Sequence, residues 1–171
     1  LSEELQMLKD MVRNFVDEKI SPFADEWEEN HHFPYEEAIK PMGALGFFGT
    51  VIPEEYGGNN MRWLAAIILI EEIARGCSAL WVQINIQTKG NAFTIHHYGS
   101  EELKRKYIPK LVSAEYVGAF AMTGPNAGSY VMSMKSTAED KGDHWLLNGY
   151  KTWISNASVA DAVIIYAYTD K

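Results

Sequence analysis

Apolar residues recur every three or four positions through the first two thirds of the chain, a spacing that places them on one face of an α-helix. Residues 2–20 form the first such stretch, with Ser2 suited to the N-cap and acidic residues in the first turn. Residues 61–75 are apolar around most of the helix circumference, which predicts a central helix. The same spacing predicts further helices over 23–30, 35–46, 78–97 and 100–113.

After residue 115 the period of the pattern changes from 3.6 to 2, the period of a half-buried strand. Helices followed by strands indicate the α+β class, with a boundary near residue 114. We therefore divide the chain into an N-terminal helical domain at 1–114 and a β domain at 115–171. Strands are predicted at 116–122, 132–139, 144–148 and 162–169, with a hairpin turn at 139–144.

The first predicted strand runs into a loop of small residues, Thr123–Ser129 (TGPNAGS), where Gly and Pro break the strand pattern. Small residues let a ligand approach the backbone, and the two end hydroxyls with exposed N–H groups suit an anion-binding concavity. The loop matches neither GxGxxG nor GxxxxGK[ST]. From the residues alone, an ordinary turn between two strands is the favoured interpretation.

Three motifs change that interpretation. The run Ala121–Tyr130 (AMTGPNAGSY) resembles the signature A-M-T-E-P-x-A-G-S-D of the flavin-dependent acyl-CoA dehydrogenases. The run Asn148–Asn156 (NGYKTWISN) is similar to the family's N-G-x-K-x-W-I-[ST]-N, and Tyr98–Lys104 (YGSEELK) to its Y-G-[ST]-E-x-x-[KR]. The resemblance covers essentially all 171 residues and is closest in wording to the glutaryl-CoA dehydrogenase branch.

The family resemblance implies a fold and a cofactor. The fold would be an N-terminal all-α domain followed by an incomplete antiparallel β domain, with the family's C-terminal helical domain absent. The cofactor would be FAD. The resemblance implies that the residues along the flavin are Phe120, Met122, Thr123, Gly128, Ser129, Trp153, Ile154 and Ser155.

The resemblance also implies a reaction, in which a carboxylate base removes the α-proton of an acyl-CoA and the β-hydrogen leaves as hydride to the flavin. Electrons would pass to an electron-transfer flavoprotein. The family's base lies in the C-terminal domain, so no Glu or Asp here is carried over as catalytic, and the isolated chain is expected not to turn over. The full-length family forms homo-oligomers, tetramers among them, and the same assembly is implied here.

The substrate contacts implied are Ser129, near the acyl-CoA, and Trp81, at a candidate acyl-pocket position. The glutaryl-CoA branch uses an Arg in the acyl-pocket helix to bind the distal carboxylate, and no Arg lies between Gly76 and Lys89. Trp81 supplies bulk and no charge, so a short or cyclic apolar acyl group is as consistent as a dicarboxylyl group. A plain helix–helix contact is the competing interpretation of Trp81.

Two residues depart from the family signature: Gly124 stands where the family has Glu, and Tyr130 where it has Asp. Gly124 removes a carboxylate, and Tyr130 replaces a small anion with a bulky phenol. An alternative therefore stays open, in which the chain is a non-catalytic, cofactor-free fragment or interaction module of the same ancestry.

Composition limits the partners and the compartment. A net charge of −8 and a pI near 5.1 argue against nucleic acid and against an anionic membrane surface. No apolar run reaches the roughly 18 residues of a membrane span, and no targeting signal is seen. We expect the bacterial cytoplasm, or the mitochondrial matrix after processing.

Single residues with metal or redox chemistry add little. Cys77 is the one cysteine, which excludes an internal disulfide, fits a reducing compartment and suggests a small buried residue rather than a nucleophile. His31 and His32 are adjacent and cannot face one way on a helix or strand, so no metal site is expected.

Overall fold

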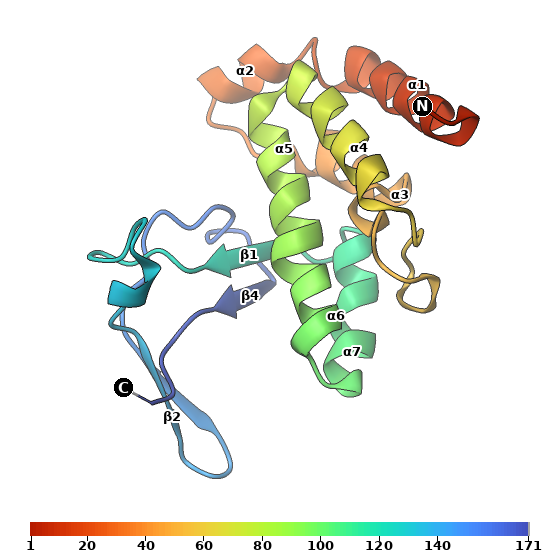
Figure 1. Cartoon of the computed structure of the whole chain (residues 1–171). Helices are drawn as coiled ribbons and strands as arrows, with labels where there is room; N and C mark the ends of the chain where they lie inside the picture. The colour runs from red at the N-terminus through yellow and green to blue at the C-terminus, as the bar shows by residue number, and fades with distance from the viewer. Residues whose placement is uncertain (171) are drawn as a thin grey trace.

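We describe residues 1–170 in a computed structural model of the chain, which has helices in its first two thirds and short strands in its last third (Figure 1). The predicted α+β fold class is confirmed. In chain order the elements are α1 (Glu3–Lys19), α2 (Ala24–Glu29), the π-helix η1 (Tyr35–Ile39), α3 (Lys40–Ala44), the 3₁₀ turns η2 (Phe47–Gly49) and η3 (Glu54–Tyr56), α4 (Trp63–Gly76), α5 (Ser78–Ile84), the π-helix η4 (Asn85–Phe93), α6 (Thr94–Tyr98), α7 (Glu101–Val112), β1 (Gly118–Ala121), the 3₁₀ turn η5 (Val131–Ser133), β2 (Thr137–Asp140), β3 (Trp145–Asn148) and β4 (Ala162–Ile165).

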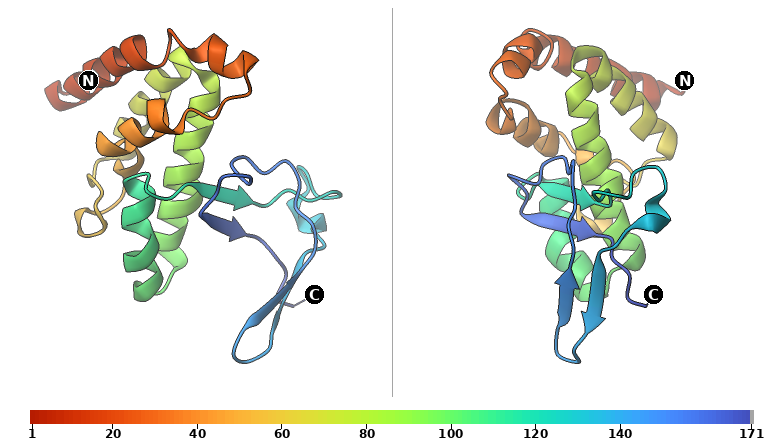
Figure 2. Two further views of the ribbon diagram at one scale, coloured as in Figure 1. Left: turned by 180° about the vertical axis from the view of Figure 1, so that it is seen from behind. Right: turned by 90° about the vertical axis from the view of Figure 1, so that its left-hand side faces the viewer.

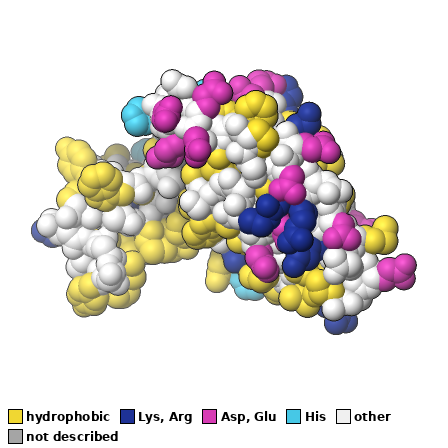
Figure 3. Space-filling view, turned by 90° about the horizontal axis from the view of Figure 1, so that it is seen from above, with side chains coloured by type: hydrophobic (Ala, Val, Ile, Leu, Met, Phe, Trp, Pro, Cys, Tyr) yellow, Lys and Arg dark blue, Asp and Glu magenta, His cyan; other side chains and the backbone are white. Residues whose placement is uncertain are grey.

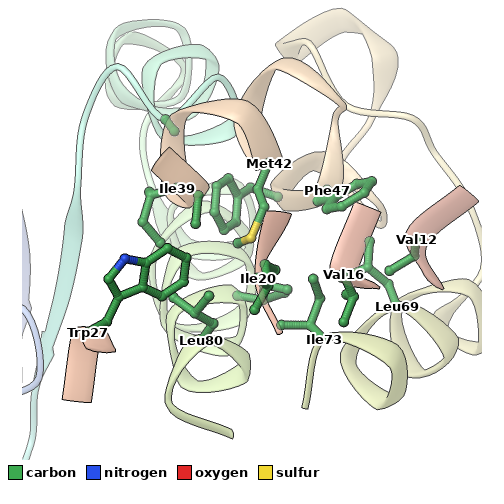
Figure 4. Packing of buried hydrophobic residues seen from close by; sticks show 14 residues of the cluster. Val12, Val16, Ile20, Trp27, Ile39, Met42, Phe47, Leu69, Ile73 and Leu80 are labelled. Carbon is green, nitrogen blue, oxygen red and sulfur yellow. The ribbon is translucent and has the colours of Figure 1, made fainter. Parts of the chain in front are cut away.

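The core of the helical part lies between α1 and α4, with α3, η2 and α5 closing it (Figure 4). The Ser2 hydroxyl accepts a hydrogen bond from the N–H of Leu5 (3.3 Å), so α1 begins where the sequence predicts. Val12 and Val16 of α1 and Ile20 directly after it are fully buried in this core, and each contributes about 1.5–3 kcal/mol to folding. Leu8 and Phe15 of the same helix are partly buried and pack against this core.

An ionic network joins α1 to α4 beside that core. Glu72 of α4 is 1% exposed and accepts from Arg13 Nε (3.0 Å) and Arg13 Nη2 (2.8 Å). Arg75 donates to Glu72 (3.1 Å) and also to Asp17 (2.7 Å), and Lys9 lies 3.6 Å from Glu72. Figure 3 shows basic and acidic side chains gathered together on the helical part of the face seen from above. The arginines keep the pKa of Glu72 below its usual value, chiefly through the hydrogen bond from Arg13.

One long helical segment runs through the centre of the molecule, formed by α5, η4 and α6 in succession (Figure 1). Its buried Gln87 binds three backbone groups from other elements. The amide nitrogen donates to the carbonyls of Leu111 (2.7 Å) and Tyr116 (2.5 Å), and the amide oxygen accepts from the N–H of Gly118 (2.8 Å). Gln87 therefore ties the end of α7 and the start of β1 to the central helix.

The strands form two separate pairs rather than one sheet. The β2–β3 hairpin is antiparallel, with Thr137 opposite Asn148, whereas β1 and β4 pair in parallel, with Gly118 opposite Ala162. In both views of Figure 2 the hairpin extends away from the helices, while β1 and β4 lie beside the central helix. The parallel pairing was not expected from the sequence. It arises because residues 149–161 cross from the hairpin back to the start of β1, where the N–H of Asp161 donates to the carbonyl of Val117 (2.9 Å).

The predicted helices are confirmed to within a few residues, but π-helical segments divide two of them. The helix at 35–46 consists of η1 and α3, and the helix at 78–97 consists of α5, η4 and α6. Two predicted strands are shorter than expected. The stretch 132–139 begins in η5, where the Ser133 hydroxyl donates to the carbonyls of Asn126 (2.6 Å) and Tyr130 (2.8 Å) and holds a turn. The strand expected at 162–169 ends at Ile165, since its partner β1 ends at Ala121. Cys77, expected to be buried, is only partly buried at the C-cap of α4.

Candidate functional site

The loop that carries the first family motif lies at the end of β1, which packs directly on η4. A Cβ on Gly118 would lie 2.6 Å from the Asn91 side chain, and one on Gly90 would lie 3.2 Å from the Phe120 ring. Glycine at both positions therefore allows the strand to approach the helix closely. Phe120 also packs on Tyr166 beyond β4, with ring centroids 5.1 Å apart. The loop thus leaves a strand that is held on both sides.

Within the loop, Gly124 and Ala127 exchange two backbone hydrogen bonds of 3.1 Å each, which closes a tight turn. Ala127 is buried, while Gly128 and Ser129 are exposed. A Cβ on Gly124 would lie 3.3 Å from the carbonyl oxygen of Tyr150. The glycine that departs from the family signature therefore faces a backbone segment of the second motif at close range.

The second motif, residues 148–156, binds β1 and the loop through three hydrogen bonds. Lys151 Nζ donates to the carbonyl of Met122 (2.8 Å), and the N–H of Thr152 donates to the carbonyl of Thr123 (3.0 Å). Further along, Asn156 Nδ2 donates to the carbonyl of Gly118 (2.9 Å). The spacing of Lys and Asn in the motif thus corresponds to contacts at two ends of the same strand. The sequence analysis predicts no role for Lys151 or Asn156, although both residues belong to the family motif and could have been predicted to contribute to the site.

The two motifs together line an open hollow of about 560 Å³, formed by Thr123, Gly124, Pro125, Gly128, Thr152 and Trp153. Trp153 is 92% exposed and has φ = 58°, a left-handed conformation that is rare for a bulky residue. Strained backbone of this kind persists only where neighbouring contacts hold it, and it clusters at ligand sites. The Thr152 hydrogen bond directly before Trp153 supplies such a contact.

The donors of this loop fit the flavin that the motifs imply. Within residues 1–170, the hydroxyls of Thr123 and Ser129 and the N–H groups of Thr123, Gly128 and Ser129 make no hydrogen bond. A Cβ on Gly128 would meet nothing within 4 Å, so the backbone there is open to a ligand. The Thr152 hydroxyl is buried and also lacks a partner in the described part of the chain. Such a set can satisfy the carbonyl and phosphate oxygens of a dinucleotide.

The other predicted site residues are more scattered. Ile154 is partly buried and Ser155 exposed, both directly after Trp153. Trp81 is 37% exposed on α5 and lines none of the hollows beside the loop. Of the residues that the family resemblance assigns to the flavin, Thr123, Gly128 and Trp153 line one hollow. Trp81, which the resemblance assigns to the substrate, lies on a separate element.

Charge at the site is carried by lysine. The three hollows beside the loop are lined by no Asp or Glu of residues 1–170. Burial lowers the pKa of Lys151. In the same described range, no three His, Cys, Asp or Glu side chains come together as a metal site, and none of the helices is long and apolar enough to cross a membrane.

Two domain families match the chain along nearly its whole length. The acyl-CoA dehydrogenase N-terminal domain matches residues 2–115, and the acyl-CoA dehydrogenase middle domain matches residues 119–171.

Individual relatives agree with these matches. Glutaryl-CoA dehydrogenase from Desulfococcus multivorans is 69% identical, over 100% of this chain and 44% of the relative. A solved glutaryl-coenzyme A dehydrogenase in complex with glutaryl-CoA superposes with a TM-score of 0.98 at 69% identity, over 99% of this chain and 44% of that one. Glutaryl-CoA dehydrogenase from Mycobacterium smegmatis in complex with FADH2 superposes with a TM-score of 0.95 at 32% identity, over the same shares. This chain thus spans less than half the length of these relatives.

Proposed function

The chain belongs to the acyl-CoA dehydrogenase family, and from this premise we propose that it contributes the flavin-binding loop of an FAD-dependent acyl-CoA dehydrogenase. The reaction class is α,β-dehydrogenation of an acyl-CoA thioester, with an electron-transfer flavoprotein as the electron acceptor. One observation carries the proposal. Hydrogen bonds from Lys151, Thr152 and Asn156 hold the two motifs together, and the hydrogen-bond donors of the loop beside them have no partner in the described part of the chain.

Each residue of the site has a proposed task. The Thr123 hydroxyl and N–H bind the ring system of the flavin, and Ser129 binds its pyrophosphate and the acyl-CoA nearby. Trp153 covers the ring system and excludes water, since an aromatic face of this size is exposed beside the hollow. Bound FAD supplies the hydride acceptor, and the protein supplies binding and orientation.

We assign the base that removes the α-proton to none of the carboxylates of residues 1–170. The hollows beside the loop contain no Asp or Glu within this range, and a general base must lie within hydrogen-bonding reach of the proton. The isolated chain is accordingly proposed to bind the cofactor without turnover.

The acyl group is proposed from the electrostatics of the central helix. Lys89 is the one cation between Ser78 and Phe93, and its ammonium lies over the ring of Trp63, 5.6 Å from the ring centroid. Although similarity to a glutaryl-CoA dehydrogenase favours a dicarboxylyl substrate, the cation that would hold its distal carboxylate is not supplied by this helix. An apolar acyl group of short or cyclic form is therefore proposed alongside glutaryl-CoA.

The first experiment is a visible absorption spectrum of the purified chain, recorded before and after addition of excess FAD and desalting. A retained flavin band, lost in Thr123→Val but kept in the control Thr137→Val on the hairpin, supports the proposal. A chain that stays colourless would refute cofactor binding by these residues. It would favour the second candidate, a cofactor-free interaction module, which the strong exposure of Tyr130 (72%) and Tyr150 (83%) also suits.

A further inference from the structure

The peptide group between Met122 and Thr123 connects two parts of the site. Its carbonyl contacts Lys151, which lines a hollow of about 150 Å³ together with residues 124–127 and 133–136. Its nitrogen belongs to Thr123, which lines the open hollow beside Trp153. This peptide group therefore links Lys151 to a residue of the proposed flavin site.

The carbonyl and the N–H of this peptide group differ in their hydrogen bonding. Its carbonyl oxygen accepts a hydrogen bond of 2.8 Å from the Lys151 ammonium. The Met122–Thr123 peptide bond is trans, so the N–H of Thr123 points away from that carbonyl and from Lys151. That N–H makes no hydrogen bond within residues 1–170. The donor is therefore without a partner in the described part of the chain, on a residue that lines the open hollow.

The charge of Lys151 is not cancelled by a neighbour. Burial is the one cause that lowers its pKa, and no carboxylate in the described range acts on its ammonium. A cation that is partly shielded from water acts more strongly on the groups it contacts than a surface cation. The Met122 carbonyl is the group in contact with it.

We propose that Lys151 is a positioning residue that strengthens the Thr123 N–H as a hydrogen-bond donor to the flavin, by polarising the Met122–Thr123 peptide. Hydrogen bonds made at the two ends of one peptide group reinforce each other. The cation also favours the reduced flavin, which carries more negative charge on its ring system than the oxidised form. Lys151 thus raises both the affinity for FAD and its reduction potential. This inference rests on the proposed function, since FAD is the acceptor.

The test compares Lys151→Gln, Lys151→Met and Lys151→Arg with the natural chain, each loaded with FAD. We measure the FAD dissociation constant by absorbance titration and the potential by reductive titration against a reference dye. Lys151→Gln and Lys151→Met should bind oxidised FAD about tenfold more weakly. The reduced form should lose about tenfold more than the oxidised form, which corresponds to a potential lower by about 30 mV for two electrons. Lys151→Arg keeps the charge and should restore both values.

A matched control and a cofactor-free measurement separate this role from a purely structural one. Lys141→Gln removes an exposed lysine that pairs with Glu139 in the hairpin and should change neither value. In the chain without FAD, the NMR signal of the Thr123 amide proton should move upfield in Lys151→Gln, because the peptide is less polarised. If Lys151→Met fails to fold, Lys151→Gln and Lys151→Arg decide the question.

The outcomes distinguish this inference from the proposed function. Failure of the natural chain to bind FAD overturns the proposed function, and the Thr123 amide signal then decides on the polarised peptide by itself. Normal FAD binding with an unchanged potential in Lys151→Gln overturns the inference and leaves the proposed function intact. An unmoved Thr123 signal overturns the inference in either case.

Discussion

At the scale of single residues, Trp153 combines two features that rarely occur together in a bulky side chain. It is almost fully exposed, and its backbone is in the left-handed region. A left-handed non-glycine residue costs of order 1–3 kcal/mol, which no burial of the ring offsets here. This unfavourable backbone conformation is explained if the ring must be at the surface to contact a ligand.

Trp153→Ala should therefore leave the free energy of unfolding within about 0.5 kcal/mol of the natural value, as expected of an exposed substitution. The same change should weaken FAD binding about tenfold, since aromatic stacking contributes of order 1 kcal/mol beyond area burial. Urea unfolding and absorbance titration measure the two effects. Trp145→Ala, which removes another exposed tryptophan, is the control and should keep FAD affinity. Equal losses of affinity in both variants would argue against a ring contact.

Glu72 is the opposite kind of residue, a buried carboxylate whose pKa is lowered chiefly by its hydrogen bond from Arg13. Glu72→Gln should reduce the free energy of unfolding at pH 7 by about 1–3 kcal/mol, because the arginines lose their anionic partner. The neighbouring, exposed Glu71→Gln should change it by less than about 0.5 kcal/mol.

The pH dependence of that loss has a definite sign. A carboxyl whose pKa is lower in the folded state stabilises the fold fully above its unfolded pKa, which is about 4.3 for Glu. The stabilisation disappears as the pH falls through the lowered folded pKa. Urea unfolding of natural chain and Glu72→Gln should therefore differ most at neutral pH and converge in acid. A difference that grows in acid would contradict this account of Glu72.

At the scale of elements, Gln87 joins three pieces of the fold that are distant in sequence. Gln87→Met keeps the volume of the side chain and removes all three hydrogen bonds, leaving backbone groups of α7 and β1 unpaired. We expect a loss of about 3–5 kcal/mol in the free energy of unfolding. Hydrogen exchange should also quicken at the amides of β1. Gln6→Met, on the exposed face of α1, should cost less than about 0.5 kcal/mol, and an equal cost in the two variants would be evidence against this role.

The helices were predictable because their apolar stripes and caps are local signals. Ser2 and Ser100 both cap as their positions suggest, each accepting from an N–H three residues later. The parallel partner of β1 was not predictable, since β4 is 44 residues away and its pairing depends on the path of residues 149–161. The π-helical turns of η1 and η4 were also missed, because a helix of either kind shows nearly the same apolar spacing.

The site residues, too, were predictable only where the signal is local in sequence. The motif letters indicated the loop, Thr123 and Trp153, which share one hollow. The second motif could have indicated Lys151 and Asn156 as residues of the site. Their hydrogen-bond partners, like those of Gln87, are backbone carbonyls far away in sequence, and no local pattern identifies them. The strain at Trp153 is likewise invisible in the sequence.

At the scale of the whole molecule, the β part exposes a large amount of apolar surface. Both faces of β3 are open, since Trp145 (55%), Leu146 (42%) and Leu147 (52%) are all exposed, and so are Val163 (44%) and Ile165 (47%) of β4. The hydrophobic colour on the β part in Figure 3 is interrupted by few charged side chains, in contrast to the helical part. Apolar surface of this extent marks an interface.

The chain should therefore self-associate as its concentration rises, in keeping with the homo-oligomer that the family resemblance implies. Replacing Trp145 and Leu147 together by Lys should shift the association by tenfold or more toward the monomer, measured by sedimentation velocity. Leu103→Lys on α7 alters an equally exposed apolar residue of the helical part and should leave the association unchanged. A natural chain that stays monomeric at high concentration would contradict the prediction.

The π-helical segment η4 has one more consequence, which concerns how this sequence can change in evolution. Each residue of an α-helix turns the chain by about 100°. Deleting a single residue between Asn85 and Phe93 would let ordinary α-helical hydrogen bonds run from Ser78 to Tyr98. It would also rotate either Gln87 or Thr94–Tyr98 by about that angle relative to the rest. Single substitutions at exposed positions of this helix can be tolerated, but its length is fixed, because a shorter helix would disrupt the packing of β1 on η4 or of α6 on α7.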